Sequence, residues 1–401
     1  MPKHTFGFIL EQTLGHVTHS KNLTANIVRD PSVEAILAPI PYETSGLSAN
    51  IPIYRSNWTV RAGIRAYRAV NQMEKSSPID ALFIHTQVPA ALMTRWIRRI
   101  PTIVSLDATP LQYDQLGEHY AHRRGSTWME MLKWKANYSA FYHASRLVTW
   151  SKWTKQSLID EYRVPAEKIV VIPPGVNLAE WASPQDDPES GLHKKEANHE
   201  TVKILFVGGN LRRKGGLDLI EAFRTIRSKN ADCADFHCTV GPKIELHLVT
   251  YEPIPEEPDL FVYNNMKPNS PELMRLFHQC DIFCLPTYGD CLPMVLSEAG
   301  AVGLPLISTD VAAISEIVRD GETGLLVPPG DVPALSKALQ TMVDDKSFRT
   351  MCGQNAAALV RQNFDGEKNA FQLLDLLKEI SLDVPSRRPK LANSLSSTFT
   401  S

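Results

Sequence analysis

Short apolar segments alternate with longer, helix-length polar segments along both halves of this 401-residue chain. The strands expected in the first half are residues 5–10, 81–85, 102–106, 147–150 and 169–172. Those expected in the second half are 204–207, 236–240, 246–249, 260–263, 282–285, 305–308 and 324–327. Such alternation is typical of parallel, doubly wound sheets covered by helices. The fold class is therefore α/β, and the length favours two domains over one core.

A polar stretch at residues 183–201 has almost no apolar side chains and separates the two halves. We predict a first domain at 1–178, a linker at 179–201 and a second domain at 202–365. A helix follows at 366–382, and the tail at 383–401 is rich in Ser, Pro and basic residues, which predicts disorder. In the second domain, helices are expected near 215–228, 271–279, 293–301 and 331–343.

The composition is that of an ordinary globular protein, with 43% hydrophobic and 21% charged residues. A net charge of −2 gives no support to nucleic-acid binding. No apolar run approaches the roughly 20 residues of a membrane span, and we expect no cleavable signal at residues 1–15. The six cysteines match no zinc spacing, so we predict no metal site and reduced thiols in a cytoplasmic protein.

The segment at 280–303 carries the clearest functional pattern. A buried strand (282–285) leads through a tight loop to a helix, with Pro293 expected at the first helical position. The start of such a helix offers free N–H groups and a positive dipole end to an anion. Asp290 lies in the loop, and Glu298 lies ~8 Å further along the helix. A nucleotide sugar, with a diphosphate between hydroxyl-bearing ends, has the layout to span them.

This segment resembles the retaining glycosyltransferases of family 4, whose signature is a pair of acids separated by seven residues. Here the pair is Asp290 and Glu298, with Asp in place of the usual Glu. The runs SEA at 297–299, GLPLI at 303–307 and EIVRDGETGLLVPPGD at 316–331 also fit. The resemblance implies the GT-B fold, two Rossmann-like domains facing across a cleft. It also implies a nucleotide-diphosphate sugar donor, no cofactor, and a last helical pattern (347–380) that returns to the first domain.

The loop GGNLRRKGG at 208–216 follows the first strand of the second domain and opens a helix. Glycines let the backbone approach a phosphate, and cationic side chains neutralise it. The resemblance assigns the donor diphosphate to Arg213 and Lys214, with Arg212 as the alternative, and Asn210 stands where many members carry Arg. A solvated basic turn is the competing interpretation.

The same resemblance implies that Glu298 binds the ribose hydroxyl groups of the nucleotide. A carboxylate suits this role, because it accepts two hydroxyl hydrogen bonds well. Asp290 is assigned a catalytic place beside the transferred sugar and the diphosphate. The backbone of Cys291, Leu292 and Pro293 lines the sugar pocket. Alternatively, Asp290 is an ordinary turn residue and Glu298 an ordinary helix residue.

In the first domain, Gly15 follows the first strand, where the family places a loop facing the diphosphate. His85 ends a strand on the cleft side and is the second catalytic candidate, although a packed structural His is an equal alternative. His16 and His19 follow Gly15, and either sits equally well on a helix surface. Asp107 ends the next strand and fits either a ligand contact or a helix cap.

Residues 121–163 hold eight Lys or Arg and three acids, interleaved with tryptophans and tyrosines. Such a stretch suits an anionic membrane surface, and several members of the family act on lipid acceptors there. A solvated helical face with core aromatics is the commoner explanation. Peripheral membrane association on the cytoplasmic face is therefore one expectation and a purely cytoplasmic protein the other.

The function that these features predict is retaining transfer of a UDP- or GDP-linked sugar to a glycan, lipid or small-molecule acceptor. The chain has no Asp-x-Asp motif, and Arg213, Lys214 and the helix start at Pro293 can neutralise the leaving diphosphate without metal. One alternative is a sugar-nucleotide-binding regulatory or scaffold protein on the same fold, and another is an epimerase or phosphorylase. The base of the nucleotide would contact residues 264–268, which do not reveal its identity.

Overall fold

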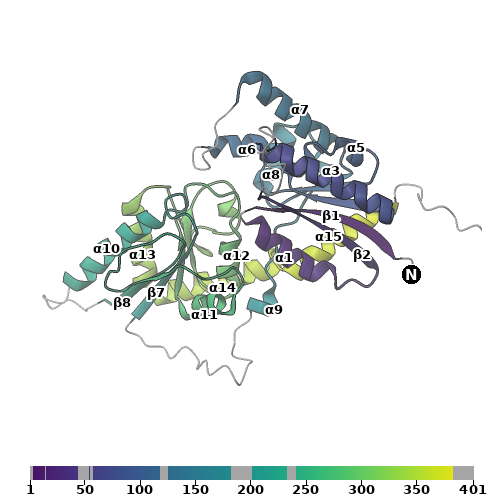
Figure 1. The fold of residues 1–401 in the computed structure, drawn as a ribbon. Coiled ribbons are helices and arrows are strands. Elements are labelled where there is room, and N and C mark those ends of the chain that lie inside the picture. The colour runs from purple at the N-terminus through teal and green to yellow at the C-terminus, as the bar shows by residue number, and fades with distance from the viewer. Residues whose placement is uncertain are drawn as a thin grey trace, which may run out of the picture.

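The structure is a computed structural model, and it describes residues 3–13, 15–43, 54, 57–117, 125–181, 201–232 and 241–382. Figure 1 shows two α/β domains, one in purple to teal and one in teal to green. The predicted strand at 236–240, most of the predicted linker and the tail at 383–401 lie outside the described residues.

The first domain is built on a parallel sheet with the strand order β2-β1-β3-β4-β5-β6. Its strands are β1 (His4–Gln12), β2 (Val33–Pro41), β3 (Ala81–His85), β4 (Thr102–Leu106), β5 (Arg146–Thr149) and β6 (Ile169–Val171). Its helices are α1 (His16–Ile27), α3 (Trp58–Ser76), α4 (Gln87–Ala90), α5 (Thr94–Ile97), α6 (Pro110–Gln115), α7 (Thr127–His143), α8 (Lys152–Asp160) and η3 (Ala166–Lys168). The short helix α9 (Leu178–Trp181) follows and packs against the core of the second domain.

The second domain repeats the plan with the strand order β12-β11-β10-β7-β8-β9, again parallel throughout. Its strands are β7 (Thr201–Val207), β8 (Lys243–Val249), β9 (Leu260–Tyr263), β10 (Ile282–Leu285), β11 (Leu306–Thr309) and β12 (Gly324–Val327). Its helices are α10 (Gly216–Asp232), α11 (Pro271–Gln279), α12 (Met294–Ala301), η6 (Ile314–Glu316), α13 (Val332–Asp344) and α14 (Lys346–Asn363), and α15 (Gly366–Leu382) follows. Two parallel sheets with flanking helices confirm the predicted fold class.

Alternation of side chains along β1 gives the first sheet two apolar faces, as expected for a sheet covered on both sides. Ile9 packs with α3, and Phe6 and Phe8 pack with α15. The ion pair between Lys378 Nζ and Asp30 (2.7 Å) fastens α15 further to the first domain. In Figure 1 α15, in yellow, lies beside α1 and covers this sheet.

The helical pattern at 347–380 consists of two helices, α14 and α15, and α15, which spans residues 366–382, is the one that returns to the first domain. The chain between them meets the segment that leaves the first sheet. Val176 donates its N–H to Phe364 O (2.8 Å), and Gly366 donates to Val176 O (2.9 Å). A Cβ atom on Gly175 would lie 2.1 Å from Gly366 Cα, so this crossing requires glycine.

Two further expectations need correction. Strand β2 was not predicted, because it is an edge strand with mixed burial and two prolines, which hide its apolar pattern. Pro293 does not occupy the first helical position. It precedes α12 with an extended ψ of 120°, so the helix begins at Met294.

Candidate active site

The glycine-rich loop after β7 lies directly against the loop after β10. Gly215 has φ +72°, and a Cβ atom there would lie 1.9 Å from Pro286 O. Only glycine fits this position, since it tolerates both the left-handed backbone and the close approach. The contact brings the side chains of Arg213 and Lys214 to the segment at 287–290.

Arg213 and Lys214 both bind the carboxylate of Asp290. Arg213 Nη1 lies 2.9 Å and Lys214 Nζ 2.8 Å from its oxygens, and Arg213 also donates to Gly289 O (2.6 Å). The hydroxyl of Thr287 donates to Asp290 Oδ2 (2.7 Å). Burial alone would raise the pKa of Asp290, but attraction to Lys214 and Arg213 holds it below its usual value. The site therefore contains two cations and an ionised carboxylate.

Asn210 shapes the loop that carries these cations. Its Oδ1 accepts the N–H of Arg213 (2.8 Å), and its carbonyl oxygen accepts the N–H of Lys214 (3.0 Å). The structure thus gives Asn210 a role in the turn, while the donor contact predicted for it stays a prediction.

Glu298 lies in α12 with 7% of its surface exposed. Burial raises the pKa of its carboxyl group to about 7. No described residue forms a hydrogen bond with this carboxyl group. A buried acid without a partner is costly unless a ligand supplies hydrogen bonds.

His85 ends β3 inside a buried cluster with His16, His19 and Trp150. His85 Nε2 lies 3.1 Å from His16 Nδ1, and the rings of His85 and Trp150 stack with centroids 5.5 Å apart. Burial lowers the pKa of His85 well below its usual value, and burial together with His16 lowers that of His19 to about 3. The ring of His85 is therefore neutral, able to donate or accept one hydrogen bond at each nitrogen.

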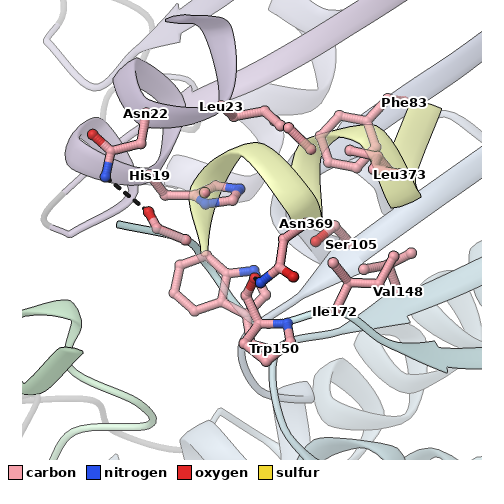
Figure 2. Close-up of a pocket in the computed structure, with 14 residues that line it drawn as sticks. His19, Asn22, Leu23, Phe83, Ser105, Val148, Trp150, Ile172, Asn369 and Leu373 are labelled. Carbon is pink, nitrogen blue, oxygen red and sulfur yellow. Dashed lines mark hydrogen bonds between the residues drawn. The ribbon is translucent and has the colours of Figure 1, made fainter. Parts of the chain in front are cut away.

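A small cavity lies beneath this cluster, where the first domain meets the crossing to α15. Figure 2 shows His19, Asn22, Trp150 and Asn369 around it, with Asn22 Nδ2 donating to Gly175 O (2.9 Å). Its volume is about 20 Å³, room for one water molecule. A more open cavity of about 140 Å³ lies between α6 and α7. None of the predicted donor residues lines either cavity.

Cys291, the residue after Asp290 in the loop that follows β10, contacts the first domain. Its side chain contacts Asp107 and Tyr113, and the Tyr113 hydroxyl donates to Asp107 Oδ2 (2.5 Å). His16 Nε2 lies 3.8 Å from the same carboxylate oxygen. Burial and Asp107 raise the pKa of the Cys291 thiol well above its usual value, so the thiol stays protonated. The two domains are therefore in contact at the ends of β4 and β10.

Glu11, at the end of β1, was not predicted as a site residue. Its buried carboxylate accepts hydrogen bonds from Thr13 Oγ1 (2.9 Å), Trp58 Nε1 (2.7 Å) and the hydroxyl of Thr86. It thereby joins the loop that leads to Gly15 with the residue that follows His85. The sequence feature that could have indicated Glu11 is an acid directly after an apolar run, here EQT at 11–13 after FIL at 8–10.

The structure thus brings Arg213, Lys214 and Asp290 together and places His85 beside His16, the residue after Gly15. A Cβ atom on Gly15 would meet no heavy atom within 4 Å, so this glycine borders open space. Leu292 is buried in the core of the second domain, which leaves only its backbone for a ligand. The structure shows no direct contact between Glu298 and the cation pair.

The described residues hold no group of three or more His, Cys, Asp or Glu side chains that could bind a metal ion. Within the same residues, no helix combines the length and the apolar character needed to cross a bilayer. Cys280, Cys284, Cys291 and Cys352 are buried free thiols.

Both halves of the chain match models of known protein families. Residues 32–180 match the family model described as Glycosyltransferase Family 4, and residues 201–345 match that described as Glycosyl transferases group 1. The chain belongs to the family 4 glycosyltransferases. The predicted family is thus confirmed, with one match in each domain.

Curated relatives of this family 4 chain are glycosyltransferases. The D-inositol 3-phosphate glycosyltransferase of Arthrobacter sp. (strain FB24) is 29% identical over 235 residues, 57% of this chain and 54% of the relative. The capsular polysaccharide biosynthesis glycosyltransferase CapM of Staphylococcus aureus is 24% identical over 57% of this chain and 60% of its own. The match therefore spans little more than half the length of these relatives.

Solved structures share the whole fold at low identity. Sucrose-phosphate synthase from Thermosynechococcus elongatus superposes with a TM-score of 0.73 at 15% identity, covering 95% of this chain and all of that one. Anabaena HepE, solved in complex with UDP-glucose, gives a TM-score of 0.65 at 17% identity over 94% and 99% of the two chains.

Proposed function

We propose that this chain transfers a sugar, with retention, from a UDP- or GDP-linked donor to a glycan, lipid or small-molecule acceptor. The observation that carries the proposal is the pair Arg213 and Lys214, held at the start of α10 beside the loop that leads to α12. Relatives named as glycosyltransferases and a fold neighbour solved with UDP-glucose support the same chemistry.

The donor diphosphate would take over the two cations from Asp290. Its oxygens carry more charge than one carboxylate, so they compete for Arg213 and Lys214. Glu298, buried and without a hydrogen-bond partner in the part of the chain that the structure describes, would accept the ribose hydroxyl groups. The carboxylate of Asp290, once displaced, would lie next to the sugar.

The reaction breaks the bond between the anomeric carbon and the diphosphate oxygen, and it forms a bond from that carbon to the acceptor oxygen. The acceptor proton passes to the departing diphosphate on the same face, so no protein nucleophile is needed. Arg213 and Lys214 stabilise the negative charge that develops on the leaving group, without metal. The neutral ring of His85 would hydrogen-bond the transferred sugar.

The test is release of UDP or GDP from a panel of sugar nucleotides, with and without a lipid extract as acceptor source. We expect release from one donor, and a loss of at least about 100-fold when Arg213 and Lys214 are both replaced by Ala. Replacing Lys229, an exposed residue in the last turn of α10, by Ala is the control and should leave the rate within about threefold. A protein that UDP or GDP stabilises against heat, but that consumes no donor, would instead be the binding or scaffold protein.

We further propose that the first domain touches an anionic membrane surface from the cytoplasmic side through one face of α7. Trp128, Met131, Leu132 and Tyr142 share this face and are at least half exposed. Lys168 lies over the Tyr142 ring, which puts a cation at the edge of the same face. Exposed aromatic and apolar groups beside cations are typical of interfacial helices.

Sedimentation with vesicles separates this arrangement from a plain solvated face. Binding to phosphatidylglycerol vesicles, but not to phosphatidylcholine vesicles, is expected, and replacing both Trp128 and Leu132 by Ser should abolish it. Equal recovery of the double variant and the parent with anionic vesicles would contradict membrane contact through α7.

A further inference from the structure

The run EIVRDGETGLLVPPGD, at 316–331, has no place in the proposed donor site, yet its first residue reaches the other domain. Glu316 ends η6 in the second domain. Its Oε2 accepts the N–H of Lys152 (3.0 Å), and its Oε1 accepts the N–H of Trp153 (2.9 Å). These are the first two residues of α8 in the first domain.

The first turn of a helix leaves N–H groups without partners inside the helix. In α8 the N-cap residue Ser151 satisfies only the N–H of Thr154 (3.1 Å). The carboxylate of Glu316 accepts the N–H groups of the two preceding residues, Lys152 and Trp153. This carboxylate also places negative charge at the positive end of the helix dipole. Both bonds cross from one domain to the other, so they break whenever the domains move apart.

A short path connects this contact with the donor loop. Ala313 donates its N–H to the carbonyl oxygen of Cys291 (3.1 Å), and the N–H of Glu316 bonds to Ala313 O (3.0 Å). Ala312 holds a left-handed φ of +52° just before this turn, a conformation that alanine adopts at a cost. Cys291 follows Asp290, so two backbone hydrogen bonds link the residue after Asp290 to Glu316.

We propose that Glu316 is a positioning residue that holds the two domains closed over the donor by capping α8. Its role in turnover rests on the proposed transferase function. The contact itself is independent of that function, since it joins Glu316 to two backbone N–H groups of the same chain.

The first test measures amide hydrogen exchange in the full chain, with Glu316→Ala compared against Glu322→Ala. Glu322 is a matched control because it lies in the same run and pairs with Arg319 on the surface (3.0 Å). Exchange at Lys152 and Trp153 should quicken at least about tenfold in Glu316→Ala and stay unchanged in Glu322→Ala. Unchanged exchange in Glu316→Ala would overturn the proposal, whether or not the protein is a transferase.

The second test separates positioning from plain stability. Glu316→Ala should lower kcat for diphosphate release about tenfold, the loss expected for one charge-assisted contact. Glu316→Gln keeps one acceptor oxygen and should recover part of that loss. UDP or GDP should raise Tm of Glu316→Ala as much as that of the parent, because Glu316 contacts neither the Arg213–Lys214 pair nor Glu298. Faster exchange with an unchanged kcat would overturn the positioning role.

Discussion

Asp290 holds the two cations that a donor diphosphate would need. Replacing Asp290 by Asn keeps its size and removes the negative charge that Arg213 and Lys214 both bind. We expect Tm of the free protein to fall by roughly 5 °C, since breaking a buried ion pair strands its partners. UDP or GDP should then raise Tm more than in the parent, because the diphosphate no longer competes with a carboxylate.

Differential scanning calorimetry with and without nucleotide measures both effects. Asp331→Asn is the control, because Asp331 caps α13 on the surface. A smaller nucleotide-induced shift in Asp290→Asn than in the parent would show that the cations do not bind the diphosphate.

Each of Arg213, Lys214 and Asp290 was predicted from the sequence as a contact to the donor, but their ion pairs were not. Local motifs show which side chains follow a strand, whereas the meeting of two loops depends on tertiary packing, here on Gly215 against Pro286. The apolar and small residues on both sides of Glu298 favour its burial, whereas the lack of a hydrogen-bond partner among the described residues emerges only from the fold.

Glu298 predicts a pH dependence for nucleotide binding. Its carboxyl pKa of about 7 means that the free protein carries mostly the protonated form below pH 7. Ribose hydroxyl groups bind the carboxylate better, so the affinity should rise about tenfold between pH 6 and pH 8. Isothermal titration with UDP or GDP measures this slope. Glu298→Gln, which cannot ionise, should remove it, and an equal slope in both proteins would contradict the ribose role.

His19 predicts an acid-sensitive stability. Its pKa is lowered from 6.5 to about 3, so the unfolded chain binds the proton more strongly than the folded protein between these values. Stability present above pH 6.5 is therefore lost as pH falls through this window, about 2 kcal/mol by pH 5. Urea unfolding should show that the free energy of unfolding of His19→Leu falls by about 2 kcal/mol less than that of the parent between pH 7.5 and pH 5. A variant with the parent's full pH dependence would be inconsistent with a buried neutral His19.

Among the elements, the turn between β7 and α10 offers a sharp test of backbone geometry. Gly215 and Gly321 both have left-handed φ values, +72° and +73°, but only Gly215 faces a close atom. Alanine at either position should cost about 1–2 kcal/mol in strain. Gly215→Ala adds the clash with Pro286 O and should cost at least ~2 kcal/mol more. Calorimetry on both variants isolates the steric part, and equal losses would mean that the two loops are not in contact.

Short apolar strands were the elements that the sequence predicted best. Five of them, at 81–85, 102–106, 260–263, 282–285 and 324–327, have the observed bounds. They are short apolar runs between turn residues, so their ends are visible in the chain. Edge strand β2 was hidden, because its mixed burial and two prolines leave no clear alternation of apolar residues.

At the scale of the whole molecule, two similar parallel sheets were predictable and the contacts between the domains were not. Asn269 donates to Asn22 Oδ1 (3.0 Å), Glu316 caps α8, and Cys291 meets Asp107 and Tyr113. These side chains come from distant segments and carry no local pattern. They hold the candidate site against the first domain, which is the arrangement that transfer with exclusion of water requires.

The most direct measurement is a crystal structure of the chain with its nucleotide sugar bound. The proposed donor site predicts diphosphate oxygens about 3 Å from Arg213 and Lys214, and ribose hydroxyl groups at a similar distance from Glu298. A nucleotide bound elsewhere, with the cations still paired to Asp290 and Glu298 still without a partner, would contradict it.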